Sequence, residues 1–142
     1  KGLSIRFNEE QVRKSGRNSM GVKSIYLDKD DIVVSSDLVC EDKYLLVISE
    51  NGYGKLTEIE KYRPQNRGGK GLLTYKNTKK TGDVAAATVV EKEDDVMIIA
   101  NSGIIIRLLT EDISIQGRNT SGVKLMNLTD AKVVAVANYI GD

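Results

Sequence analysis

Short apolar runs rich in β-branched residues recur along the chain, and they predict β-strands. Two of these runs, residues 44–49 and 96–100, are followed by Asn51-Gly52 and by residues 101–103 (NSG), which are sequences typical of hairpin turns. Further strands are predicted at residues 32–34, 84–90 and 133–137. No stretch combines a convincing helical spacing of apolar residues with capping residues, so we expect an all-β fold.

The chain is built from a unit of about 50 residues that is used about three times. Residues 16–23 (GRNSMGVK) recur as residues 117–124 (GRNTSGVK), and half that offset finds residues 65–72 (QNRGGKGL) in the equivalent place. We divide the partial domain 1–142 into an incomplete blade at 1–40 and two blades at 41–90 and 91–142. About four short strands per unit indicate propeller-like blades, and three blades cannot close a ring.

The composition excludes most enzyme classes. The chain has no histidine and one cysteine, Cys40, so the usual zinc sites and the Ser-His and Cys-His nucleophiles are all excluded. We expect no catalytic site, metal or cofactor in this chain. Paired carboxylates, Glu9 with Glu10 or Glu111 with Asp112, stay open as a minor alternative for acid–base chemistry. Cys40 follows apolar residues, and we expect a packed, inert thiol.

Charge is unevenly distributed, although the net charge is only +1. Residues 54–82 have eight basic and two acidic side chains, whereas residues 28–43 have six acidic and two basic ones. This segregation makes a basic rim plausible, which would suit a polyanionic partner. No apolar run approaches the roughly 18 to 20 residues that a membrane-spanning helix needs, and no secretory signal is present, so we expect a cytoplasmic protein.

The repeated loop combines glycines with basic residues, a pattern that suits phosphate. Glycine permits positive φ and brings backbone N–H groups close to a ligand, while arginine and lysine donate charge-assisted hydrogen bonds to phosphate oxygens. One such loop alone is better explained as a tight turn with an exposed arginine. Three equivalent loops on successive blades, however, would present a curved row of cations to a bent duplex.

We also assign a basic residue to the end of the strand that follows the turn in each repeat, at Arg6, Lys55 and Arg107. The predicted DNA-binding residues are Arg17, Lys23, Lys55, Arg63, Gln65, Arg67, Gly68, Gly69, Lys70, Gly71, Arg107, Arg118 and Lys124.

Residues 65–71 (QNRGGKG) match six of the seven positions of the glutamine-arginine-arginine-glycine-glycine-lysine-glycine signature of the DNA gyrase A C-terminal domain. Residues 51–55 and 111–123 also resemble blades of that domain. The copy here departs from the signature at Asn66, and it lies in mid-chain, whereas the principal signature of the family lies in the first blade. The resemblance implies a β-pinwheel whose blades exchange strands, with about three of its six blades in this chain.

The resemblance also implies a function. In that family the domain bends duplex DNA around a basic perimeter, so that the ATP-dependent holoenzyme, a type IIA topoisomerase, introduces negative supercoils. The implied partners are double-stranded DNA, the rest of gyrase A, and gyrase B in an A2B2 heterotetramer of the bacterial cytoplasm, associated with the nucleoid. ATP and magnesium would be used elsewhere in the holoenzyme.

Two other interpretations remain. The C-terminal domain of topoisomerase IV has the same blade repeat, but its signature is degenerate, and the intact residues 67–71 (RGGKG) favour gyrase. The alternative from another class is a protein-interaction propeller with no nucleic-acid role. The chain has no tryptophan and no Trp-Asp or Gly-His element, which disfavours that alternative.

Overall fold

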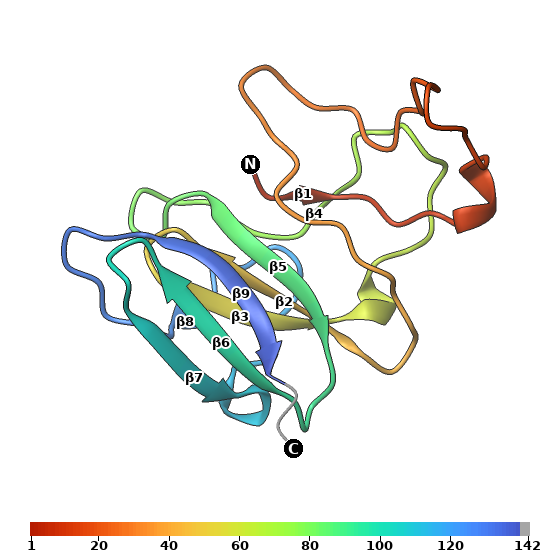
Figure 1. Cartoon of the computed structure of the whole chain (residues 1–142). Helices are drawn as coiled ribbons and strands as arrows, with labels where there is room; N and C mark the ends of the chain where they lie inside the picture. Colours follow the sequence, from red (N-terminus) through yellow and green to blue (C-terminus); the bar gives the residue numbers. More distant parts are fainter. Residues whose placement is uncertain (140–142) are drawn as a thin grey trace.

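The computed structural model describes residues 1–139, and its named strands form three antiparallel sheets (Figure 1). The all-β prediction is confirmed. The strands are β1 (Leu3–Ser4), β2 (Tyr44–Ser49), β3 (Tyr53–Glu58), β4 (Leu72–Leu73), β5 (Val84–Val90), β6 (Asp95–Ala100), β7 (Ile105–Leu109), β8 (Val123–Lys124) and β9 (Val133–Tyr139). Three short 3-10 turns occur at Glu9–Gln11, Ile59–Lys61 and Thr110–Asp112. Within the described part of the chain, no helix is long and apolar enough to cross a membrane.

The central sheet has the strand order β5-β2-β3-β8. Strands β2 and β3 form a hairpin in which Leu46 pairs with Leu56, and the turn between them contains Asn51-Gly52 as the sequence predicts. In β2 the consecutive residues Leu46, Val47 and Ile48 are all fully buried. Both faces of this strand are therefore covered, which explains its continuous apolar sequence.

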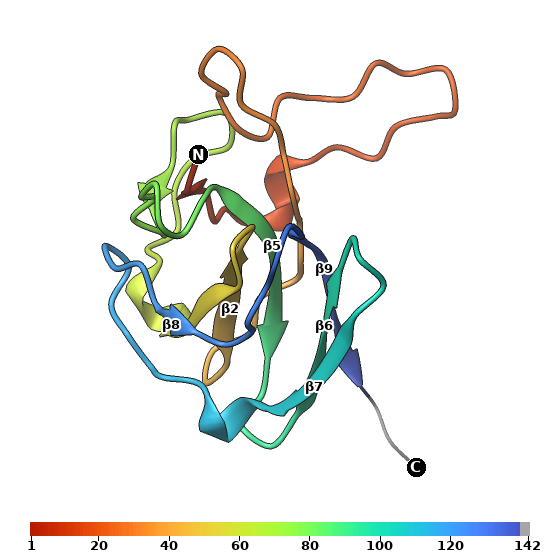
Figure 2. The same cartoon turned by 90° about the vertical axis from the view of Figure 1, so that its left-hand side faces the viewer.

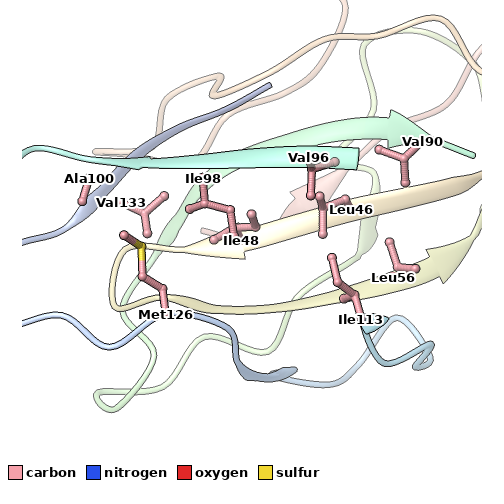
Figure 3. Close-up of a cluster of buried hydrophobic side chains, with 10 residues drawn as sticks. All are labelled: Leu46, Ile48, Leu56, Val90, Val96, Ile98, Ala100, Ile113, Met126 and Val133. Carbon is pink, nitrogen blue, oxygen red and sulfur yellow. The ribbon is translucent and has the colours of Figure 1, made fainter. Parts of the chain in front are cut away.

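The third sheet has the order β7-β6-β9 and repeats the arrangement of β3, β2 and β5. Its central strand β6 alternates between buried and partly exposed residues, so only one face of this strand lies on the core. The core fills the space between the second and third sheets, where Ile48 of β2 lies near Ile98 of β6 and Met126 (Figure 3). Burial of each such side chain stabilises the fold by about 1.5–3 kcal/mol.

The outer strands are exchanged between repeats. Strand β8 belongs to the third repeat in sequence, yet Val123 pairs with Gly54 of β3 in the second. Likewise β4 of the second repeat pairs with β1 of the first, with Leu73 opposite Leu3. The strand exchange that the resemblance implies is thus present at both junctions between repeats, and it ties each blade to the next.

Two expectations about the first repeat were wrong. Residues 32–34 form no strand, and Ile32 and Val33 are 72% and 60% exposed. The equivalent strands β5 and β9 pair with β2 and β6, whereas residues 1–31 contain only the short β1, so residues 32–34 have no strand to pair with. Cys40 follows this segment and is exposed, not packed, for the same reason. Figure 2 shows the first glycine loop, which follows the first 3-10 turn, extending away from the sheets.

Candidate nucleic-acid interface

The three glycine loops occupy equivalent places in their repeats. Each follows one of the 3-10 turns, and each ends in a glycine with positive φ: Gly21 at 71°, Gly71 at 85° and Gly122 at 74°. The register is 50 residues from the first copy to the second and 51 from the second to the third. Arg17 and Arg67 are therefore structural equivalents, and Arg118 is the third member of the set.

The second and third loops dock on the preceding repeat through the same backbone hydrogen bonds. The N–H of Gln65 donates to the carbonyl of Arg6 at 2.7 Å, and the equivalent N–H of Gln116 donates to the carbonyl of Leu56 at 2.8 Å. A second pair of bonds runs the other way, from the N–H of the preceding repeat to the loop carbonyl. These bonds join Tyr26 to Gly69 at 2.8 Å and Lys76 to Thr120 at 3.0 Å.

The repeated arginine has a structural role at both junctions. The guanidinium of Arg67 donates to the carbonyl of Lys23 at 2.5 Å and to that of Gln11 at 3.1 Å. Arg118 donates to the carbonyl of Leu73, the equivalent of Lys23, at 3.1 Å. The side chain thus braces two repeats against each other. Because a guanidinium has five N–H donors, each of these arginines keeps donors for a ligand.

Lys55 lies inside the protein, fully buried. Its ammonium donates to the carbonyls of Gly117 at 2.6 Å and Arg118 at 2.7 Å, and to the hydroxyl of Thr120 at 2.9 Å. Burial lowers the pKa of Lys55 to about 8, and the nearby charge of Arg118 acts in the same direction. This side chain fixes the shape of the third loop from beneath.

The burial of Lys55 follows from the register of β3. Lys55 pairs with Val47, whereas Arg107 pairs with Met97, and the two hairpins align so that Lys55 is equivalent to Ile106. The sequence-based assignment of Lys55 with Arg6 and Arg107 is therefore one residue out of register. Successive side chains of a strand point to opposite faces, so this single step puts Lys55 on the face of β3 that the third loop covers. The opposite face is covered as well, because Leu56 is only 1% exposed.

Arg6 and Arg107 are equivalent, and both are engaged by neighbours. Arg107 forms an ion pair with Asp95, and its guanidinium carbon lies 4.3 Å from the ring centre of Tyr139. Arg6 pairs with Glu41 and donates to two backbone carbonyls of the second repeat. Among the described residues the contacts of the Arg107 guanidinium are to Asp95 and Tyr139, and none joins it to a glycine loop.

Exposed lysines from adjacent repeats gather at two tyrosines. The ammonium groups of Lys23 and Lys70 lie 5.7 and 5.8 Å from the ring centre of Tyr26, whose side chain is 47% exposed. Lys124 and Lys80 lie 5.8 and 5.5 Å from the ring centre of Tyr53 in the same way. Cation–π attraction of this kind holds the charges in place at the surface. Lys80 is absent from the residues predicted from the sequence.

The remaining predicted residues divide between surface and scaffold. Arg17, on the projecting loop, and Arg63 are both exposed. The side-chain oxygen of Gln65 is buried without a hydrogen-bond partner among the described residues. Gly68 donates its N–H to the carbonyl of Ser24 at 2.8 Å, so its backbone, like that of Gly69, is engaged in docking the loop.

A cavity of about 410 Å³ lies where the third loop meets the second repeat, lined by Lys61, Leu73, Gly117, Arg118 and Asn119. Lys61 was not among the predicted residues. The aligned repeats place it at the position of Gln11 and Asp112, so only the second repeat has a cation there. This difference between the repeats is the feature of the sequence from which Lys61 could have been identified as a site residue.

The family model for the DNA gyrase C-terminal domain, beta-propeller, matches residues 1–40, 43–91 and 94–138. The chain belongs to this family. DNA gyrase A of Ureaplasma parvum is 46% identical over 133 residues, which are 94% of this chain and 16% of that protein. DNA gyrase A of Staphylococcus epidermidis is 43% identical over 141 residues, 97% of this chain and 16% of its own length.

Solved structures agree with membership of the gyrase C-terminal domain family. A DNA gyrase A C-terminal domain superposes with a TM-score of 0.93 at 32% identity, covering 98% of this chain and 48% of that one. The C-terminal domain of a DNA topoisomerase IV superposes with a TM-score of 0.90 over 96% of this chain and 43% of that one. At 20% identity, this second likeness shows the fold alone. The gyrase resemblance and the propeller-like blades predicted from the sequence are confirmed.

Proposed function

We propose that this chain binds double-stranded DNA through its basic loops and bends the duplex around the edges of its blades as part of DNA gyrase A. The observation that carries the proposal is that two arginine-bearing loops dock on successive repeats through equivalent backbone hydrogen bonds, with one equivalent arginine bond at each. Equivalent docking puts an arginine at the same place on each of these two repeats, and successive blades present these arginines along the path of the duplex. Family membership supports the same function.

The contacts that we assign to DNA are to phosphates, which position a duplex without reading its sequence. Surface cations carry them: the exposed Arg17, Lys23, Arg63, Lys70 and Lys124, the partly exposed Arg118, and the free donors of Arg67. We give Lys55, Gln65 and the loop glycines a supporting role, because they fix the loops that hold those cations. Arg107 contributes through its half-exposed guanidinium, which Asp95 partly neutralises.

In the holoenzyme this wrapping would fix the handedness of the DNA crossing, so that ATP-driven strand passage introduces negative supercoils. We place the chain beside gyrase B in an A2B2 assembly of the bacterial cytoplasm, at the nucleoid, with ATP and magnesium bound by other parts of the enzyme.

Salt dependence tests this proposal. If about six phosphates are neutralised, affinity for duplex DNA should fall about a thousandfold between roughly 50 and 200 mM salt. Fluorescence anisotropy with a labelled duplex of arbitrary sequence would measure this. Lys70→Glu should weaken binding strongly, whereas Lys92→Glu, an exposed lysine beside the acidic residues Glu91 and Glu93, should have a much smaller effect. An affinity that is flat with salt and indifferent to Lys70→Glu would contradict the proposal.

A further inference from the structure

The cavity at the junction of the second and third repeats has cations on more than one side. Arg118 uses one hydrogen bond of its guanidinium, to the carbonyl of Leu73, in the part of the chain that the structure describes. Lys61 is 61% exposed, and its contact with Glu58 is long, at 4.0 Å. Beneath the loop, the ammonium of Lys55 lies 2.6 Å from the carbonyl oxygen of Gly117. Two positive charges, those of Arg118 and Lys61, therefore line this volume, while the charge of Lys55 lies beneath the loop and outside the lining.

The equivalent position at the junction of the first and second repeats is built differently. There Gln11 stands in place of Lys61, and its side-chain oxygen accepts the N–H of Arg67 at 2.8 Å. Its carbonyl also accepts the Nε–H of Arg67 at 3.1 Å. Ile5 stands in place of Lys55. The side-chain amide of Gln11 thus bonds to the loop at this junction, whereas at the junction of the second and third repeats the exposed ammonium of Lys61 has, among the described residues, only the long contact with Glu58.

The side chains that line the cavity between the second and third repeats suit a tetrahedral anion with one or two negative charges. A guanidinium presents paired N–H donors to two phosphate oxygens, and a flexible lysine adds a point charge from another side. The side-chain amide of Asn119, also in the lining, is a further donor. A carboxylate is absent from the lining residues, so an anion bound here meets no like charge in the cavity wall.

We propose that the cavity between the second and third repeats is a phosphate site for the DNA backbone, held by Lys61 and Arg118, and that Gln11 removes the equivalent site from the first junction. This inference rests on the proposed function, because it names where one phosphate of the bound duplex lies. It also predicts that the two junctions contribute unequally to binding, although their loops dock alike.

Inorganic phosphate tests the site without DNA. In a titration of the 142-residue chain followed by amide NMR, phosphate should shift the signals of Gly117 and Asn119 and leave those of Asn66 and Gly68 unmoved. Lys61→Gln copies the residue that the first repeat already has, so it should fold normally and abolish the shifts. Absent shifts, or equal shifts in Lys61→Gln, would overturn the inference.

Duplex binding then identifies the source of the phosphate. Lys61→Gln should reduce the slope of log affinity against log salt by about 1, and the converse Gln11→Lys should increase it by about 1. Lys92→Gln, distant from both junctions in sequence, is the matched control for loss of one charge. If the slope of log affinity against log salt is the same in all three variants, the inference is wrong and the proposed function is unaffected. Phosphate shifts in a chain that binds no duplex would instead overturn the proposed function and the DNA backbone as the source.

Discussion

Gly122 packs so closely against Gly54 that a Cβ atom added to Gly122 would lie 2.4 Å from the carbonyl oxygen of Gly54. The same relationship joins Gly71 to Ser4 at the other junction, at 2.1 Å. A real side chain cannot approach a carbonyl oxygen so closely, so the last glycine of each of these two loops is required for strand exchange, over and above its positive φ.

Gly122→Ala should therefore destabilise the fold by about 2–4 kcal/mol, because it adds both backbone strain and a clash. Gly103→Ala is the matched control. Gly103 also has positive φ, at 88°, but nothing lies within 4 Å of its added Cβ, so it should cost only about 1–2 kcal/mol. Urea denaturation followed by circular dichroism measures both. Equal losses in the two variants would show that the close approach to Gly54 is not a constraint.

The buried ammonium of Lys55 should make stability depend on pH. Its pKa is about 8 in the folded chain and near 10.5 when unfolded, so the cost of burying the charge is complete below pH 8. Between pH 8 and 10.5 the folded state loses the proton first, and stability rises by up to about 3 kcal/mol. Lys55→Ile, which copies Ile5 and Ile106, removes this contribution.

The measurement is the free energy of unfolding of both proteins at pH 7 and pH 10, taken as a difference so that the titration of other groups cancels. The neighbouring groups are Arg118 and Tyr75, whose ring centre is 5.7 Å from the ammonium, and burial raises the pKa of Tyr75. A difference between wild type and Lys55→Ile that is constant with pH would refute the prediction.

The Arg67→Lys variant tests the structural role of the arginine separately from its positive charge. Lysine keeps the positive charge but cannot reproduce the guanidinium bonds to the carbonyls of Gln11 and Lys23, so the fold should lose about 1–2 kcal/mol. The salt dependence of DNA binding should stay the same. Arg63→Lys, at an exposed position of the same repeat, should change stability by less than about 0.5 kcal/mol. A stable Arg67→Lys protein that has lost DNA affinity would mean that the arginine acts on the ligand alone.

Cys40 should react as a surface thiol. Because the residue is exposed, iodoacetamide should alkylate it in the native chain about as fast as in denaturant. Cys40→Ser should leave the unfolding free energy within about 0.5 kcal/mol. Mass spectrometry after timed quenching follows the reaction. A native thiol that is protected from alkylation would contradict the exposed position.

Most strands of the second and third repeats could be predicted from the sequence. Strands β2 and β5 are apolar runs whose ends are marked by turn residues or charges, and the predicted bounds agree with the structure. The strand predicted at residues 32–34 is wrong because a strand needs a neighbouring strand to pair with, as well as residues that favour β-structure. Of the predicted site residues, the sequence could identify the loops but not the side chains that face outward from them.

The repeat, its length and the arginine-bearing glycine loop follow from the sequence by itself, because recurrence at a fixed spacing is a property of the chain. Only the tertiary structure decides which of the repeated cations are exposed to solvent. Lys55 and Gly117 are 62 residues apart in sequence, and strand exchange brings them into contact. A charge that a distant backbone carbonyl satisfies looks the same, in sequence, as one that faces water.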